Sequence, residues 1–247
     1  MKTKNNRKLI FSSLLVSIFF VTSYGHAQSF TSGVKQTTLI ELYTSEGCSS
    51  CPPAERYLNT FKNHPDLWKE YIPVALHVDY WDYLGWQDRF ASSRHTQRQR
   101  QFARVNRQNT IYTPGFFVNG QPWRKGLFGG SPQQSKKQVG ELKLNIEQSK
   151  LTAMFSPANK NIKARTLTIA ILGMGLKSNI NAGERDGEIP KHDFVLLNHA
   201  QHQSKNNEWS FNLPKYDKKE STGIAIVAWI SESKTPVPLQ AVGGYLK

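Results

Sequence analysis

The chain of 247 residues has little cysteine, few acidic residues and no long apolar run. Its two cysteines exclude a disulfide-rich scaffold, and they cannot by themselves supply the four ligands that a structural zinc site usually needs. Eighteen Asp and Glu residues stand against 32 Lys and Arg residues, so the formal net charge is +14. We interpret this excess as a solvated basic surface that faces anionic surroundings.

The one extended apolar stretch lies at the start of the chain, from Leu9 to Val21, and follows four basic residues. It is shorter than the roughly 20 residues that span a bilayer. The small residues Gly25 and Ala27 come after it. This pattern predicts a secretory signal peptide over residues 1–27, cleaved after Ala27, with retention as a membrane anchor as the alternative. We therefore expect a periplasmic or secreted protein with no stable membrane span after cleavage and no nucleic-acid partner.

Apolar periodicity predicts alternating strands and helices between residues 37 and 149. The predicted elements are a strand at 37–43, a helix at 51–63, a strand at 72–78, a helix at 93–106, a strand at 115–118, a strand at 122–127 and a helix at 131–149. Asn119-Gly120 suits the tight turn of a hairpin, and Ser131-Pro132 suits the start of a helix. The resulting order, βαβαββα, predicts an α/β domain over residues 28–150.

The sequence changes character after Lys150. Six strand-like segments are separated by turn-rich stretches, and no convincing helical pattern interrupts them. They lie at 151–155, 165–172, 193–203, 208–213, 223–230 and 239–246. We expect a small antiparallel β-sandwich domain over residues 151–247.

The two cysteines stand close together in Cys48-Ser49-Ser50-Cys51, between the first predicted strand and the first predicted helix. A disulfide over so short a gap can open and close without refolding the chain, whereas a disulfide that stabilises a fold closes a long loop. The spacing therefore indicates redox chemistry. The alternative is a structural disulfide in a non-enzymatic binding or scaffold protein.

The order βαβαββα, with Cys-x-x-Cys opening the first helix, resembles the thioredoxin fold. Thioredoxin-like proteins also place a cis-proline just before the third strand, facing the dithiol, and Thr113-Pro114 stands at the corresponding place. Residues 41–55, 77–86 and 112–114 look like a secreted bacterial family that is classed only as a domain of unknown function. The resemblance implies an α/β thioredoxin-like domain and a redox role, without an assigned substrate.

The resemblance also implies roles for the residues around the dithiol. It assigns Cys48 as the exposed attacking thiolate and Cys51 as the thiol that resolves the mixed disulfide. Pro114 would face the dithiol, and Glu41 would be a buried acid that accepts the proton of Cys51, with Asp79 as its rival. We therefore expect a thiol–disulfide oxidoreductase that uses no cofactor, acts on polypeptide or small thiol substrates and exchanges electrons with a redox partner protein.

An aromatic segment follows the strand at 72–78, where the carboxyl ends of parallel strands gather. Its aromatic members are Tyr80, Trp81, Tyr83 and Trp86. We expect these side chains to bind an extended polypeptide, with Thr113 adding a backbone edge. The alternative is that they cap the core or seal an interface between domains.

A copper chaperone is a further alternative, because exported thioredoxin-like copper chaperones bind metal through two cysteines and a distant histidine. His77 would be the third ligand, beside Cys48 and Cys51. Those chaperones usually separate their cysteines by three residues, and a histidine in a buried strand is more often part of the core. The oxidoreductase, with no metal in its site, is therefore the interpretation that we favour.

Overall fold

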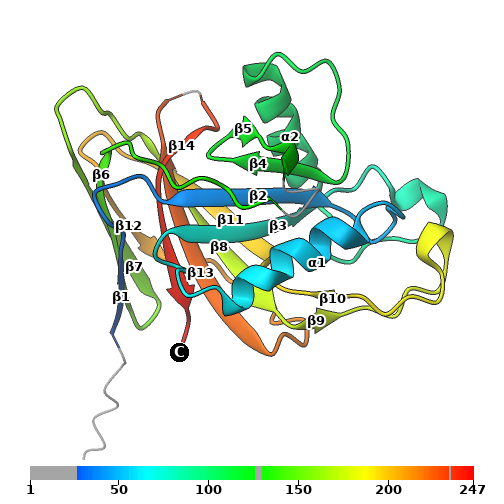
Figure 1. Cartoon of the computed structure of the whole chain (residues 1–247). Helices are drawn as coiled ribbons and strands as arrows, with labels where there is room; N and C mark the ends of the chain where they lie inside the picture. The colour runs from blue at the N-terminus through cyan, green and yellow to red at the C-terminus, as the bar shows by residue number, and fades with distance from the viewer. Residues whose placement is uncertain (1–26, 126–129, 234) are drawn as a thin grey trace, which may run out of the picture.

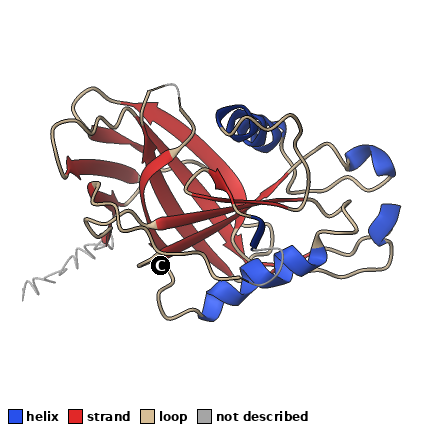
Figure 2. Ribbon diagram, turned by 45° about the horizontal axis from the view of Figure 1, so that its top comes forward, coloured by secondary structure: helices blue, strands red, loops and turns tan. Residues whose placement is uncertain are grey.

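The computed structural model describes residues 27–125, 130–233 and 235–247 (Figure 1). The predicted signal peptide, apart from Ala27, and the end of the predicted strand at 122–127 lie outside these residues. The described chain forms a mixed α/β protein with two α-helices, a large mixed sheet and a small antiparallel sheet (Figure 2). No helix in this part of the chain is long and apolar enough to cross a membrane.

The predicted alternation of strands and helices is confirmed as far as the hairpin, but the returning strand predicted over 122–127 is shorter, because β5 ends at Pro122 and residues 124–125 form a 3-10 turn. The elements are β2 (Thr38–Thr44), α1 (Pro52–Thr60), β3 (Tyr71–His77), α2 (Ser93–Val105), β4 (Gly115–Val118) and β5 (Gln121–Pro122). A 3-10 turn, η1 (Phe61–Asn63), continues α1 to its predicted end. β2 pairs in parallel with β3 and antiparallel with β4. The loop from β2 to α1, which carries both cysteines, therefore leaves the sheet at the carboxyl ends of β2 and β3.

The predicted helix at 131–149 is wrong. Residues 140–147 form strand β6 (Gly140–Glu147), and residues 130–137 have no regular secondary structure. Buried and exposed side chains alternate along β6, with Leu142, Leu144 and Ile146 facing the core. This two-residue period is that of a strand with one buried face. The Ser-Pro pair that suggests a helix start lies upstream, in the irregular segment.

The strands predicted after residue 150 are confirmed. They are β7 (Lys150–Pro157), β8 (Thr166–Met174), β11 (Val195–Gln203), β12 (Glu208–Asn212), β13 (Gly223–Ser231) and β14 (Pro238–Tyr245). Three shorter strands accompany them, namely β1 (Gln28–Thr31), β9 (Leu176–Lys177) and β10 (Lys191–His192).

Some of these strands pair into the same sheet as strands from the first half of the chain. Four of them join the large sheet, whose order is β14-β13-β8-β11-β3-β2-β4-β5. The junction is a parallel pairing of Val195 in β11 with Ala75 in β3. The small sheet has the order β1-β6-β7-β12. Strands from both sides of residue 150 thus contribute to both of these sheets, so the separate β-sandwich predicted over residues 151–247 is wrong. The domain boundary at residue 150 stays a prediction.

The two α-helices cover opposite faces of the sheet near β2 and β4. Leu42 lies opposite Phe116, and the ring of Phe116 meets Tyr57 of α1 edge to face. One residue earlier in β2, Glu41 lies opposite Phe117, and the ring of Phe117 stacks on Phe102 of α2. Because neighbouring residues of a strand point to opposite faces, α1 and α2 lie on the two sides of this sheet.

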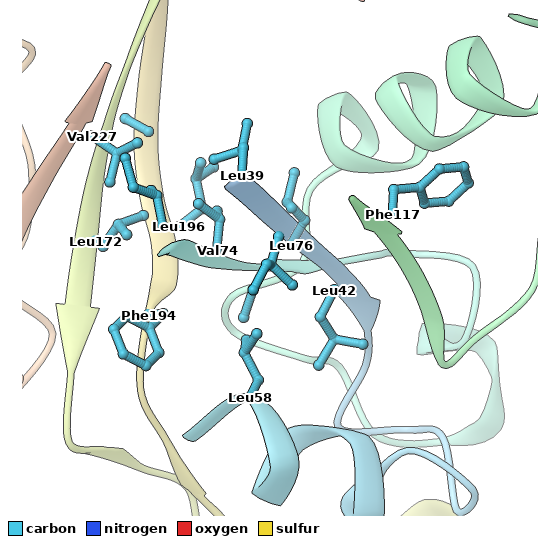
Figure 3. Packing of buried hydrophobic residues seen from close by; sticks show 14 of the residues in the cluster. Leu39, Leu42, Leu58, Val74, Leu76, Phe117, Leu172, Phe194, Leu196 and Val227 are labelled. Atoms are coloured by element: carbon cyan, nitrogen blue, oxygen red, sulfur yellow. The ribbon is translucent and has the colours of Figure 1, made fainter. Parts of the chain in front are cut away.

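Two apolar cores hold these layers together. In the first, Leu58 of α1 lies near Leu42 of β2, and the cluster continues through Leu76 to Leu196 and Phe194 (Figure 3). In the second, buried residues of β6 and β7 pack against those of β8, β13 and β14, which joins the small sheet to the large one. The close packing of these cores holds β2 and α1 in place on the two sides of the loop that carries the cysteines.

Candidate functional site

The two cysteines form a disulfide between the end of β2 and the start of α1, with their Cα atoms 5.5 Å apart. The loop is a tight turn, because Cys48 N donates to Ser45 O over 3.1 Å and Cys51 N donates to Cys48 O over 3.2 Å. Cys51 is the N-cap of α1. Two prolines follow at the first helical positions, where their missing N–H groups leave no helical bond unmade.

Both cysteines are fully buried, with 0% of their surface exposed. The expectation that Cys48 is exposed is therefore wrong for this disulfide state. Ser49 and Ser50, between the cysteines, are exposed instead. The hydroxyl of Ser50 lies 3.5 Å from Cys48 Sγ.

Two hydrogen bonds link Trp81 to Thr113 and Thr113 to Cys48. Thr113 Oγ1 donates to Cys48 Sγ over 3.2 Å, and Trp81 Nε1 donates to Thr113 Oγ1 over 2.7 Å. The peptide bond between Thr113 and Pro114 is cis, as the resemblance implies. Three of the predicted site residues, Cys48, Thr113 and Trp81, thus form one hydrogen-bonded chain.

The other predicted aromatic residues have different surroundings. The hydroxyl of Tyr80 donates to Gln99 Oε1 over 3.2 Å, and burial raises the pKa of Tyr80 to about 12. Tyr83, in the 3-10 turn η2 (Asp82–Leu84), is 78% exposed. Trp86 Nε1 donates to the buried carboxylate of Glu46 over 2.9 Å. Only Tyr83 among them presents most of its side chain to an incoming chain.

The two candidate proton acceptors are both held by neighbours on α2. The carboxylate of Glu41 accepts two bonds from Arg98, at 2.6 and 3.1 Å, and lies on the face of the sheet that α2 covers. Asp79 Oδ1 accepts from the hydroxyl of Thr96 over 2.5 Å. The role of Glu41 as a base for Cys51 stays a prediction.

A buried cluster of ionisable side chains lies beneath the dithiol loop, the loop from β2 to α1 that carries both cysteines. Most members of this cluster were not predicted from the sequence. Its members are Glu46, Glu55, His77, Asp88, Arg185 and His192. Glu46 follows Ser45 in the loop itself, and its carboxylate meets His192 Nε2 at 3.1 Å. The carboxylate of Glu55, on α1, accepts from Thr44 Oγ1 over 2.7 Å.

The other half of the cluster is a pair between β3 and the segment before α2. His77 Nδ1 and Asp88 Oδ2 are 2.6 Å apart, and both side chains are fully buried. The same carboxylate oxygen accepts from Glu46 N over 2.8 Å, which ties the pair to the dithiol loop. The rings of His77 and His192 meet edge to face, with their centroids 5.0 Å apart.

Charge balance explains why so many ionisable groups can share this interior. Burial alone would lower the pKa of His77, but the charge and hydrogen bond of Asp88 raise it above the ordinary value. Burial alone would raise the pKa of Asp88, but the charge of His77 holds that pKa below its ordinary value. Burial would likewise raise the pKa of Glu46, but its hydrogen bond with His192 holds that pKa below the ordinary value. Paired charges avoid the large cost of an isolated buried charge.

One signal in the sequence could have indicated Glu55, since it stands four residues after Cys51 and so shares its side of the helix. Arg185 and His192 gave no such signal, because they lie far along the chain from the cysteines. Within the described part of the chain, no group of three or more His, Cys, Asp or Glu side chains is arranged to hold a metal ion.

Comparisons with known proteins support the fold. The model of a family described as "Protein of unknown function (DUF1223)" matches residues 39–231. The crystal structure of protein AGR_C_4864 from Agrobacterium tumefaciens is similar, with a TM-score of 0.60 and 20% identity over 83% of this chain and 92% of that one. HBP35 of Porphyromonas gingivalis has a TM-score of 0.54 and 16% identity, over 87% of this chain and 76% of that one. The search of curated proteins found no match.

Proposed function

The chain belongs to the DUF1223 family of proteins of unknown function, and we propose that it is an exported, thioredoxin-like thiol–disulfide oxidoreductase. The observation that carries the proposal is the disulfide of Cys48 and Cys51 at the start of α1, in hydrogen-bond contact with Thr113, whose peptide bond to Pro114 is cis. Residues 28–150 would be the thioredoxin-like part, and residues 151–247 would support it. The signal-like start of the sequence favours action in the periplasm or outside the cell, where disulfides persist.

The reaction is a two-step exchange between thiols and the disulfide. A substrate thiolate attacks Cys48 Sγ, the Cys48–Cys51 bond breaks, and Cys51 leaves as a thiolate that takes up a proton. A second substrate thiolate then attacks the sulfur of the first, which releases Cys48 as a thiolate. The substrate loses two electrons and gains a disulfide, and the protein gains the two electrons as a dithiol. A redox partner protein that carries a disulfide would restore the Cys48–Cys51 bond by the reverse exchange: Cys48 attacks the partner's disulfide, Cys51 then attacks Cys48 Sγ, and the partner leaves with the two electrons as a dithiol.

The hydrogen-bonded chain above Cys48 suits this reaction. When Cys48 becomes a thiolate, the hydroxyl of Thr113 can donate to a full negative charge, and hydrogen bonds to charged groups are the stronger ones. Trp81 orients that hydroxyl because its indole N–H occupies the acceptor side of Thr113 Oγ1. A thiolate stabilised in this way leaves and attacks at neutral pH.

The burial of both cysteines requires the site to open before a substrate sulfur can reach Cys48. Thr113 contacts Cys48 Sγ, and Trp81 holds the hydroxyl of Thr113 in place. A polypeptide that docks on the exposed ring of Tyr83 would arrive near this pair, since Tyr83 and Trp81 are two residues apart. The substrate class that we propose is therefore a polypeptide or a small thiol.

Complete burial of the disulfide favours one rival, a binding or scaffold protein in which the disulfide is structural. The deciding measurement is a titration of the mature protein against glutathione redox buffers, read by thiol alkylation and mass. A reversible transition in the folded protein supports the oxidoreductase. A pair that is reduced only when the protein unfolds would replace it with the scaffold protein.

The copper chaperone, with Cys48, Cys51 and His77 as ligands, makes a different prediction for the same preparation. His77 Nδ1 lies against Asp88 in the described structure. Copper(I) binding to the reduced protein that disappears in Cys48→Ser would support the chaperone. A mixed disulfide trapped by Cys51→Ser, with no copper bound by the wild type, would support the exchange reaction.

A further inference from the structure

We propose that Arg185 is a positioning residue of the dithiol site, which holds the dithiol loop against the carboxylate of Glu55 and so sets how readily the disulfide is reduced. The inference rests on the proposed redox function and assigns part of its control to the second half of the chain. Arg185 ends the 3-10 turn η4 (Gly183–Arg185), and its side chain is 1% exposed.

The first contact of Arg185 is with the backbone of the dithiol loop. Arg185 Nη1 lies 3.5 Å from the carbonyl oxygen of Ser45. That oxygen also accepts the N–H of Cys48 over 3.1 Å. One carbonyl group therefore joins the guanidinium to the turn that holds the first cysteine, and a shift of Arg185 would shift that turn.

The second contact is with Glu55 on α1. Arg185 Nη1 lies 3.3 Å from both carboxylate oxygens of Glu55. Glu55 stands one helical turn after Cys51, and its N–H donates to the carbonyl oxygen of Cys51 over 3.1 Å. Side chains four residues apart on a helix are neighbours, and both of these are buried. Arg185 thus neutralises a carboxylate beside the second cysteine.

Two outer contacts fix the segment that carries Arg185. The carboxylate of Glu184 accepts the N–H of Ser49 over 3.3 Å, between the two cysteines. Arg185 Nε donates to the carboxylate of Glu188 over 2.9 Å. Consecutive residues of one turn therefore reach the dithiol loop, Glu184 at its exposed tip and Arg185 at its buried base.

The electrostatic consequence has a definite sign. Two glutathione thiolates reduce the disulfide, with one molecule of oxidised glutathione released, and they leave negative charge or exchangeable protons on Cys48 and Cys51. A cation near a thiolate stabilises it, and an unpaired carboxylate destabilises it. Loss of Arg185 should therefore favour the disulfide, and loss of the Glu55 charge should favour the dithiol.

The test measures the glutathione equilibrium of the wild type and of four variants of the mature chain. We expect Arg185→Gln to lower the equilibrium constant for reduction about tenfold, which is about 30 mV for a two-electron couple, and Glu55→Gln to raise it about tenfold. The double variant should return to within about threefold of wild type, because it removes both charges. Arg185→Lys should recover part of the change, since it keeps the charge and loses the planar fork.

Arg165→Gln is the matched control, because Arg165 donates to the backbone oxygen of Lys205 and should leave the equilibrium unchanged. If Arg185→Gln does not fold, the shift in Glu55→Gln decides the matter alone. Equal constants in wild type, Arg185→Gln and Glu55→Gln, or shifts of the same sign in the two variants, would overturn the inference and leave the redox function standing. A wild-type disulfide that cannot be reduced in the folded protein would overturn both the inference about Arg185 and the proposed redox function.

Discussion

Thr113 Oγ1 donates a hydrogen bond to Cys48 Sγ over 3.2 Å, although 65 residues separate the two in sequence. The bond joins the loop before β4 to the loop after β2, and Trp81 completes it from the loop after β3. Three loops from neighbouring strands are thus joined by one hydrogen-bonded chain that ends at the sulfur atom of Cys48.

Thr113→Val should destabilise the thiolate form of Cys48, because it removes the hydroxyl that donates to the sulfur and keeps the shape of the side chain. A hydrogen bond to a charged group contributes about 1.5 kcal/mol or more, so we expect the alkylation rate of Cys48 in the reduced protein at pH 7 to fall about tenfold. The measurement is the rate of iodoacetamide addition against pH. Thr113→Ser, which keeps the donor, should react like wild type, and an unchanged rate in Thr113→Val would contradict the prediction.

The pair of His77 and Asp88 should stabilise the fold in a defined pH window. The pKa of His77 is raised in the folded state, so its contribution is full below the unfolded pKa of about 6.5 and is lost as the pH rises through the folded value. The pKa of Asp88 is lowered, so its contribution is full above about 3.9 and is lost as the pH falls through the folded value. The pair is therefore strongest between about pH 4 and pH 6.5.

Asp88→Asn tests this window. Breaking a buried ion pair costs about 3–5 kcal/mol, and we expect that loss in the free energy of unfolding at pH 5.5, with a smaller loss at pH 8.5. Urea unfolding at several pH values measures it. Asp217→Asn removes an exposed carboxylate and should change stability by less than about 0.5 kcal/mol at each pH. A loss that is the same at both pH values would argue against a charged His77.

Glu41→Gln separates a redox role for Glu41 from a structural one. The carboxylate is bonded to Arg98 on the α2 side of the sheet, and the guanidinium of Arg98 also lies 4.7 Å from the ring centre of Phe102. We expect the variant to lose about 3 kcal/mol of unfolding free energy, because it leaves a buried guanidinium unpaired. Its glutathione equilibrium should stay at the wild-type value. A shift of that equilibrium would instead support Glu41 as the proton acceptor of Cys51.

The parts of the fold that the sequence predicts correctly are those with a strong local signal. β2, β3 and β13 are short apolar runs, and α2 begins directly after its N-cap Ser92. The failure at residues 131–149 comes from competing local signals. A Ser-Pro pair suggests a helix start, but the alternation from Gly140 to Glu147 pairs with β7 along its whole length. Tertiary pairing decides between such signals, and it is not visible in a short window.

The residues of the candidate site also fall into those that could be predicted from the sequence and those that could not. The two cysteines and Trp81 could be predicted from motif spacing and the edge formed by parallel strands, and Thr113 from the resemblance to thioredoxin-like proteins. Arg185 and His192 could not, because β11 joins β3 through the single pairing of Val195 with Ala75, and this long-range junction brings the second half of the chain to the dithiol.

Tyr83 offers the sharpest test of substrate class. Its ring is 78% exposed, so Tyr83→Ala should leave the unfolding free energy within about 0.5 kcal/mol of wild type. If a polypeptide docks there, loss of the ring should raise KM for a peptide dithiol about fivefold, which corresponds to the roughly 1 kcal/mol of an aromatic contact. The reaction with glutathione should not change, because so small a thiol needs only the sulfur of Cys48. Met154→Ala, which removes an exposed apolar side chain from the small sheet, should affect neither reaction. Equal KM values for the peptide in Tyr83→Ala and wild type would exclude docking on this ring. An equal loss of activity with the peptide and with glutathione would instead show that Tyr83 affects access to the disulfide for every thiol.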